Sequence, residues 1–164
     1  MNRTRIVVVA ASVLAVLTVI AAVVPAGTVL VADDTDTDQR YLTVPVSEGS
    51  TVALEYTHSV ERSRVYEAYA VRGETLEMTR AEFESYGWGF PSAANVTIEN
   101  GTFVYSPDRT AAAVLTVSPG RIAGHTLHVD DRSYDLVSVT DAQSVDLHVV
   151  HRTLLATMIE SIYE

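Results

Sequence analysis

The chain has 164 residues, 48% of them hydrophobic, which is enough for one compact domain with a packed core plus an appendage. Its formal net charge of −10 argues against nucleic acid as a partner, because phosphates require a basic surface. The chain has no cysteine, which excludes disulfides, thiolate metal sites and a cysteine nucleophile. All 11 basic residues are arginine, and an acidic surface without lysine is typical of a halophile. An acidic surface encoded by a GC-rich genome is the alternative.

The N-terminal residues 1–32 are predicted to form a membrane anchor. Arg3 and Arg5 precede an apolar stretch, residues 6–24, which is long enough to cross most of a hydrocarbon core of about 30 Å. The arginines favour a cytoplasmic N-terminus and therefore a domain outside the cell, in a single-pass protein of the cell membrane. A cleaved signal peptide is the alternative, although its apolar region is normally only about 7–15 residues long.

The next segment, residues 33–40 (DDTDTDQR), is predicted to be an acidic tether that stays solvated. The folded domain is expected to span residues 41–164. Up to residue 140 it consists of short alternating runs separated by turn residues, and Asn100-Gly101 is the strongest hairpin signal. This pattern predicts a mainly β, antiparallel fold of about seven to nine strands, either a sandwich or a partly open barrel.

The C-terminal region is predicted to form an amphipathic helix from Asp141, capped by Thr140 and covering an open sheet edge or barrel mouth. The alternative is a last strand, Val145–Val150, followed by a shorter helix. The apolar stripe of the helix comprises Leu147, Val150, Leu154, Leu155, Met158, Ile159 and Ile162.

A hairpin between residues 51–60 and 65–71 provides the candidate site. If the strands pair across the turn at residues 61–64, His58 lies opposite Glu67 on the face assigned to the core. A carboxylate in a core is costly unless it has a partner, and histidine can be that partner. The pair is interpreted either as a structural device that determines the strand register or as the polar part of a ligand-binding site.

The same register places Tyr56 opposite Tyr69, next to this pair. Arg62 and Arg64 lie in the turn, where they could contact an anion at the mouth of the site, or be ordinary solvated charges. Ser59 points away from His58 on a strand, so the two form no catalytic dyad. No other nucleophile motif is present, and we expect no enzymatic activity.

The other histidines do not predict a metal site. His125 and His128 point to opposite faces of a strand, and His148 and His151 lie on neighbouring faces of the predicted helix. No third ligand follows from the spacing, so we expect no metal and no cofactor. Asn95 and Asn100 lie in sequons and are glycosylation candidates.

Two motifs resemble those of a known family. HSVE at residues 58–61, followed by Val65 and Glu67, and GWGFP at residues 87–91 are similar to the His-Ser-Val-Glu and Gly-x-Gly-x-Pro signatures of small exported domains of unknown function. These domains are often encoded beside TAXI-type TRAP solute transporters. Trp88 stands where the family usually has a small residue. The loop is shaped by Gly87, Trp88, Gly89 and Pro91.

The resemblance implies a role linked to a transporter and supplies no established catalytic residue. The leading hypothesis is a membrane-anchored accessory or binding module whose partners include transporter subunits. The alternatives are a small hydrolase or metalloenzyme that uses His58 and Glu67, and a structural cell-surface domain.

Overall fold

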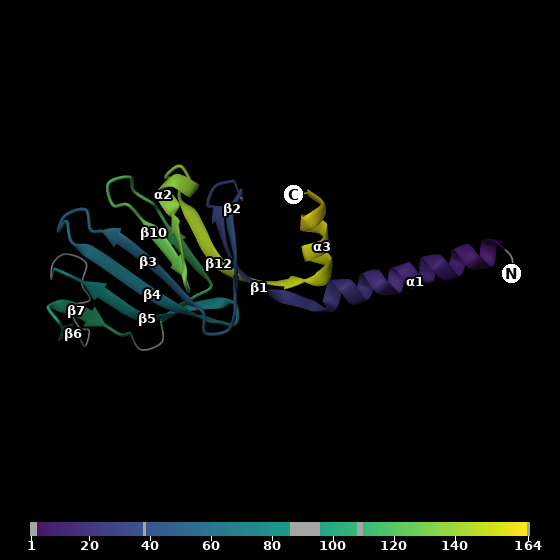
Figure 1. Ribbon diagram of the computed structural model, residues 1–164, viewed down its shortest axis with the longest axis horizontal. Helices are drawn as coiled ribbons and strands as arrows, with labels where there is room; N and C mark the ends of the chain where they lie inside the picture. The colour runs from purple at the N-terminus through teal and green to yellow at the C-terminus, as the bar shows by residue number, and fades with distance from the viewer. Residues whose placement is uncertain (1–2, 38, 86–95, 108–109, 164) are drawn as a thin grey trace. The chain divides into compact units, whose positions relative to one another are not determined.

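The computed structural model describes residues 3–37, 39–85, 96–107 and 110–163 (Figure 1). The chain divides into two units. The first comprises Met1–Thr28 and His151–Glu164, and the second comprises Val29–Val150. The second unit contains most of the strands and the candidate site.

The first unit contains the helix α1 (Arg3–Val23) and the helix α3 (Leu154–Tyr163), which contact each other. Within α1, Arg5–Val23 is 19 residues long and apolar enough to cross a membrane, so the helix is compatible with a single-pass anchor. The prediction that the anchor extends to residue 32 is wrong. The helix ends at Val23 because Pro25 disfavours helical geometry at the preceding residue, and β1 (Pro25–Asp34) begins there.

The second unit is built from two sheets, which confirms the prediction of a mainly β fold (Figure 1). The four-stranded sheet has the order β2-β1-β12-β9, with β2 at Arg40–Val46, β9 at Val114–Val117 and β12 at Val145–Thr153. The eight-stranded sheet has the order β11-β10-β3-β4-β5-β7-β6, and β8 also pairs with β5. Its strands are β3 (Thr51–Thr57), β4 (Arg64–Arg72), β5 (Thr75–Phe83), β6 (Val96–Glu99), β7 (Thr102–Tyr105), β8 (Thr110–Ala112), β10 (Thr126–Val129) and β11 (Arg132–Asp135).

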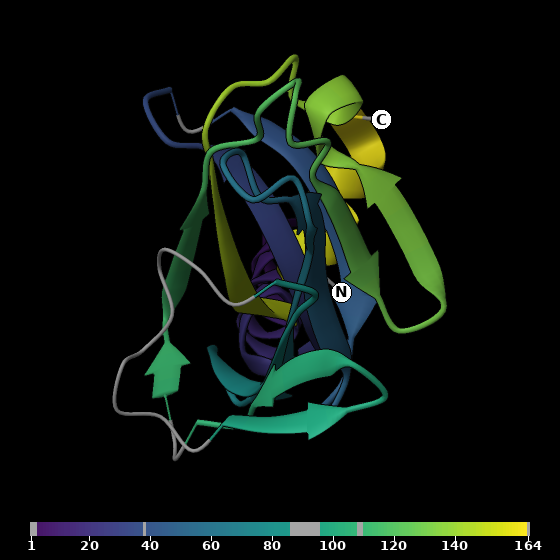
Figure 2. The same ribbon diagram turned by 90° about the vertical axis from the view of Figure 1, so that its left-hand side faces the viewer.

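Both sheets pack their apolar faces into one hydrophobic core. Leu30 and Leu147 come from the smaller sheet, and Val52 and Leu127 from the larger one. The architecture is therefore a sandwich, one of the two arrangements that the strand pattern allowed. Figure 2 shows the β6–β7 hairpin at one edge of the larger sheet and the light-green β10–β11 hairpin at the other.

The β6–β7 hairpin turns at Asn100-Gly101, as the sequence predicted. Both residues have positive φ, 52° at Asn100 and 88° at Gly101, which a two-residue turn of this kind requires. Asn100 is exposed in this turn, so it remains accessible as a glycosylation candidate.

The expected acidic tether is instead a turn between β1 and β2. The buried Asp34 accepts hydrogen bonds at Oδ1 from the backbone N–H groups of Asp36 (3.0 Å) and Thr37 (2.8 Å), and at Oδ2 from the Tyr41 hydroxyl (3.0 Å). The Thr37 hydroxyl also donates to Oδ1 (2.8 Å), and this bond is the largest cause that lowers the pKa of Asp34, to which the other three bonds add. An aspartate that replaces backbone hydrogen bonds in this way makes a turn. The sandwich therefore begins at Val29, because the apolar residues 29–32 are buried in β1.

The C-terminal region follows the alternative interpretation, a strand and then a shorter helix. No helix begins at Asp141. The short helix α2 (Leu136–Val139) ends at Thr140, and Asp141 has a φ of 50° that does not continue a helix. The strand β12 follows, with alternate residues buried, and α3 groups with α1 in the first unit. Leu147 could not distinguish the predicted helix from the alternative strand, because it fits the apolar stripe of a helix and the apolar face of a strand equally well.

Candidate functional site

The hairpin of β3 and β4 has a different register from the one predicted. Leu54, not His58, lies opposite Glu67, while Val52 lies opposite Tyr69 and Tyr56 opposite Val65. The strands have slipped by four residues relative to the prediction. An even shift leaves every side chain on the same face, so the alternation of apolar residues could not distinguish the two registers.

His58 lies in the loop that joins the two strands. Its N–H donates to Ser63 O (2.9 Å), its carbonyl accepts from Arg62 N (2.9 Å), and its Nδ1 accepts from Glu61 N (3.2 Å). The imidazole thus has a local role in shaping the loop, and the predicted His58–Glu67 pair is wrong. The hydrolase or metalloenzyme hypothesis loses its basis with this pair.

Glu67 lies on the inner face of the larger sheet, the face that forms the core. Its neighbours across the strands are Leu54 and Ala81, both buried. Within the part of the chain that the structure describes, no group donates a hydrogen bond to its carboxylate. Burial raises the pKa of Glu67, because an apolar environment disfavours the charged form.

Two tyrosines share this face with Glu67. Tyr56 is partly buried and Tyr69 is buried, and the negative charge of Glu67 adds to burial in raising the pKa of both phenols. The pKa of Tyr56 rises to about 12, so both hydroxyls stay protonated at neutral pH. Neutral phenols can donate or accept hydrogen bonds, and they therefore accompany Glu67 as candidate binding groups.

His125 joins this group through Tyr56. The two rings stack with their centroids 4.7 Å apart and their planes 14° from parallel. Nδ1 of His125 accepts a hydrogen bond from Gly120 N–H (3.2 Å), so the neutral ring has its proton on Nε2. Burial lowers the pKa of His125 and favours this neutral form. We call Tyr56, Glu67, Tyr69 and His125 the Glu67 cluster.

His125 is the member of the cluster that sequence reasoning missed. It precedes β10, which pairs with β3 although some 70 residues of chain separate them. The local sequence contains no signal for that pairing. Glu67, Tyr56 and Tyr69 were correctly placed on one face, because the alternation along each strand determines the face.

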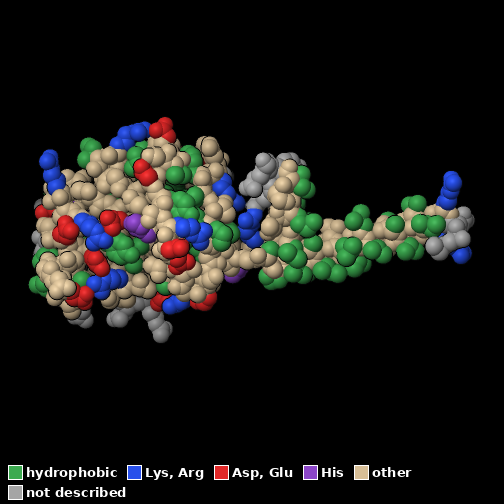
Figure 3. Space-filling view, in the orientation of Figure 1, with side chains coloured by type: hydrophobic (Ala, Val, Ile, Leu, Met, Phe, Trp, Pro, Cys, Tyr) green, Lys and Arg blue, Asp and Glu red, His purple; other side chains and the backbone are tan. Residues whose placement is uncertain are grey.

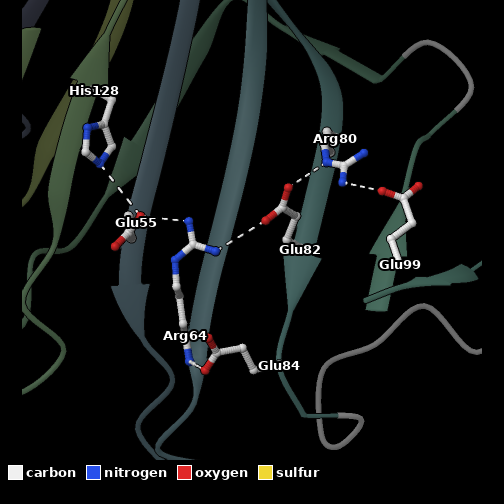
Figure 4. Close-up of polar contacts among 7 residues, drawn as sticks. All are labelled: Glu55, Arg64, Arg80, Glu82, Glu84, Glu99 and His128. Carbon is white, nitrogen blue, oxygen red and sulfur yellow. Dashed lines mark hydrogen bonds and ion pairs between the residues drawn. The ribbon is translucent and has the colours of Figure 1, made fainter. Parts of the chain in front are cut away.

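Of the two arginines predicted in the turn at the mouth of the site, Arg62 lies in the loop and Arg64 lies on β4. Arg64 belongs to the outer face of the sheet, opposite the face of Glu67, and pairs with Glu55 (2.9 Å) and Glu82 (3.2 Å) (Figure 4). Arg62 is exposed in the loop, with a φ of 51°. The proposed anion contact therefore loses Arg64 as a component.

The outer face has a ladder of alternating charges that crosses the strands. Arg80 continues it, with ion pairs to Glu82 (2.6 Å) and Glu99 (2.7 Å) (Figure 4). The hydrogen bond from Arg80 is the largest cause that lowers the pKa of Glu82. The carboxylates on the two faces of this sheet thus have opposite environments. Two arginines stabilise Glu82 as an anion on the outer face, and among the described residues no cation lies beside Glu67 on the inner face.

Other candidate residues are not brought together. Among the described residues, no three His, Asp or Glu side chains form a group that could hold a metal ion. The loop residues Gly87, Trp88, Gly89 and Pro91 and the glycosylation candidate Asn95 lie outside the described residues.

The comparison with protein families matches the part of the chain that contains the cluster. The model of the domain of unknown function DUF1850 matches residues 52–136, just over half of the chain and all of the Glu67 cluster. No curated protein and no solved structure is significantly similar to the chain. The chain therefore belongs to the family of the domain of unknown function DUF1850.

Proposed function

We propose that this protein is a membrane-anchored extracytoplasmic binding module that serves a TRAP-type solute transporter. The anchor is α1, whose polar side chains suit a lipid environment. The Ser12 hydroxyl donates to Val8 O (2.9 Å) and the Thr18 hydroxyl to Leu14 O (2.9 Å), so neither is left without a partner. Arg3 and Arg5 favour a cytoplasmic N-terminus and an external sandwich.

The binding role rests on one observation, the carboxylate of Glu67 on an apolar face without a donor among the described residues. A ligand that donates hydrogen bonds or has a positive charge would compensate this group. The phenol oxygen of Tyr56 can accept a further hydrogen bond near an otherwise apolar surface, and the neutral His125 ring stacked on Tyr56 adds no positive charge. We therefore propose a small organic cation, such as a solute with an ammonium group, as the ligand class.

A binding experiment on the full-length protein in a mild detergent tests this ligand class. Butylammonium is expected to bind, and butyrate, which has a similar chain and the opposite charge, is not. Glu67→Gln should weaken butylammonium binding by about tenfold or more, equivalent to about 1.4 kcal/mol. Isothermal titration calorimetry or chemical-shift changes would measure the difference.

Glu82→Gln is the matched control, because it removes a carboxylate from the outer face of the same sheet. It should leave butylammonium binding unchanged. Equal binding of butyrate, or equal loss in both variants, would contradict the proposed site. No binding of either probe would favour a structural cell-surface domain instead.

The link to a transporter is supported by the resemblance of the HSVE and GWGFP motifs to domains encoded beside TAXI-type TRAP transporters. We expect integral transporter subunits to co-purify with the full-length protein from native membranes in a mild detergent. Mass spectrometry of the eluate would identify them, with an unrelated single-pass protein as the control bait. Their absence from the eluate would count against this partner. The acidic, lysine-free composition supports the further proposal that the module works in high salt.

A further inference from the structure

The C-terminal helix α3 presents an apolar face that the described residues of the first unit leave exposed. At 100° per residue, Leu154, Leu155, Met158, Ile159 and Ile162 fall on one side of the helix. The exposed fraction is 60% for Met158 and 76% for Ile162, and Leu154 and Ile159 are exposed as well. So dense a set of exposed large apolar residues on one short helix marks an interaction surface.

Two hydroxyls of α3 bond to backbone carbonyl groups in the preceding turn. The Thr157 hydroxyl donates to Thr153 O (3.1 Å), and the Ser161 hydroxyl donates to Met158 O (2.8 Å). Neither hydroxyl depends on water for a hydrogen bond. The helix can therefore leave bulk water without leaving these groups unpaired.

The position of α3 in the first unit is tied to the end of α1. Leu154 N–H, at the start of α3, donates to Val24 O (3.0 Å), directly after the apolar span Arg5–Val23. That span is about 28 Å long at 1.5 Å per residue, close to the thickness of the hydrocarbon core. If α1 crosses the membrane, Val24 lies at the membrane boundary, and the start of α3 lies there too.

The direction of α3 relative to α1 keeps the whole helix near the membrane boundary. The helix runs across the direction of α1 rather than along it (Figure 1). Figure 3 shows hydrophobic side chains on the side of α3 turned toward the N-terminal end of α1, which is the side that would face the lipid. An amphipathic helix with this orientation buries its apolar face about 5–10 Å into the boundary between headgroups and acyl chains.

We infer that α3 lies in the membrane–water boundary on the side of the sandwich, with the apolar face of Leu154, Met158, Ile159 and Ile162 in lipid. The inference rests on the proposed function, since it requires α1 to be a membrane anchor. The first unit then contacts the membrane in two ways, through the span of α1 and along the apolar face of α3.

Spin labels on single cysteines test this arrangement, because the chain has no cysteine of its own. The full-length protein is reconstituted into vesicles of phosphatidylcholine and phosphatidylglycerol. Labels are placed by Met158→Cys and Ile162→Cys on the apolar face and by Thr157→Cys on the polar face. Val13→Cys marks the middle of α1, and Ile122→Cys marks an exposed position in a loop of the sandwich. Accessibility to oxygen, which concentrates in lipid, is compared with accessibility to a water-soluble nickel chelate.

The expected result is that the labels at residues 13, 158 and 162 are more accessible to oxygen, whereas those at residues 122 and 157 are more accessible to nickel. Nickel accessibility at residues 158 and 162 with oxygen accessibility at residue 13 would overturn the inference and leave the anchor intact. Nickel accessibility at residue 13 would overturn both. Protection of residues 158 and 162 from both reagents would show that protein, such as a transporter helix or a second copy, covers α3, and would also overturn the lipid assignment.

Discussion

Replacing Glu67 by glutamine is expected to raise the free energy of unfolding by about 1 kcal/mol at about pH 8. The charged carboxylate is costly on the inner face of the sheet, because no described group donates a hydrogen bond to it, and glutamine removes the charge at nearly constant shape. The gain is placed at the low end of the cost of an unpaired polar group, since the side chain is partly exposed. Urea unfolding of the full-length protein in detergent measures it.

The charge of Glu67 is expected to make the free energy of unfolding depend on pH. Burial raises the pKa of Glu67 in the folded state above the ordinary value of 4.5. Between the ordinary pKa and the raised pKa of the folded state, the folded protein binds more protons than the unfolded chain. The free energy of unfolding therefore falls as the pH rises from the first pKa to the second. Glu67→Gln should abolish this fall and should gain nothing over the original protein below the ordinary pKa.

Glu82→Gln is again the control, with the opposite sign. The pKa of Glu82 is lowered by Arg80 and Arg64, so this carboxylate stabilises the fold above its ordinary pKa, and the contribution is lost as the pH falls. Its replacement should destabilise the protein at about pH 8 and lose this effect in acid. A destabilised Glu67→Gln at about pH 8 would mean that Glu67 has a favourable partner in the folded protein, and would contradict the ligand site.

Leu127→Ala is expected to lower the free energy of unfolding by about 2–5 kcal/mol. Leu127 is fully buried on β10, where it pairs with Leu54 of β3 and Tyr134 of β11, within the core shared by both sheets. The truncation removes apolar contacts and leaves a cavity that the surrounding sheets can close only in part. The urea midpoint should fall at an unchanged slope.

Ile122→Ala is the matched control for this core substitution, because the Ile122 side chain is 93% exposed. Its effect should stay within about 0.5 kcal/mol. Similar losses in the two variants would mean that Leu127 is not packed in the core, and that the pairing of β10 with β3 is not as described.

Strand identity and side-chain face were accessible from the sequence, whereas register was not. Period-two alternation put Tyr56, Glu67 and Tyr69 on the core face, and the structure agrees. The same alternation is unchanged by a slip of four residues, so it could not tell that Leu54 rather than His58 lies opposite Glu67. The register depends on the six-residue loop after β3, in which the backbone of His58 bonds to Ser63 and Arg62.

The N-terminal part of the chain also has some features that the sequence predicts and others that it does not. The apolar run of α1 follows from composition. Pro25 explains why the helix ends at Val23, although the anchor was predicted to reach residue 32. The burial of residues 29–32 in β1 does not follow from composition, because an apolar run next to a membrane helix is equally suited to lipid and to a core. Asp34 shows why the acidic run is not a tether: a single carboxylate that accepts several local hydrogen bonds holds the turn.

The sequence by itself determined the apolar N-terminal helix, the β class, the hairpin at Asn100-Gly101 and the face on which Glu67 lies. These features depend on residues close together in the chain, through hydrophobic periodicity and turn conformation. Only the tertiary structure decided that His125 stacks on Tyr56, that Arg64 lies on the outer face beside Glu55 and Glu82, and that α3 contacts α1. Each of these depends on which distant segments become neighbours, and that choice is made by the packing of the whole fold.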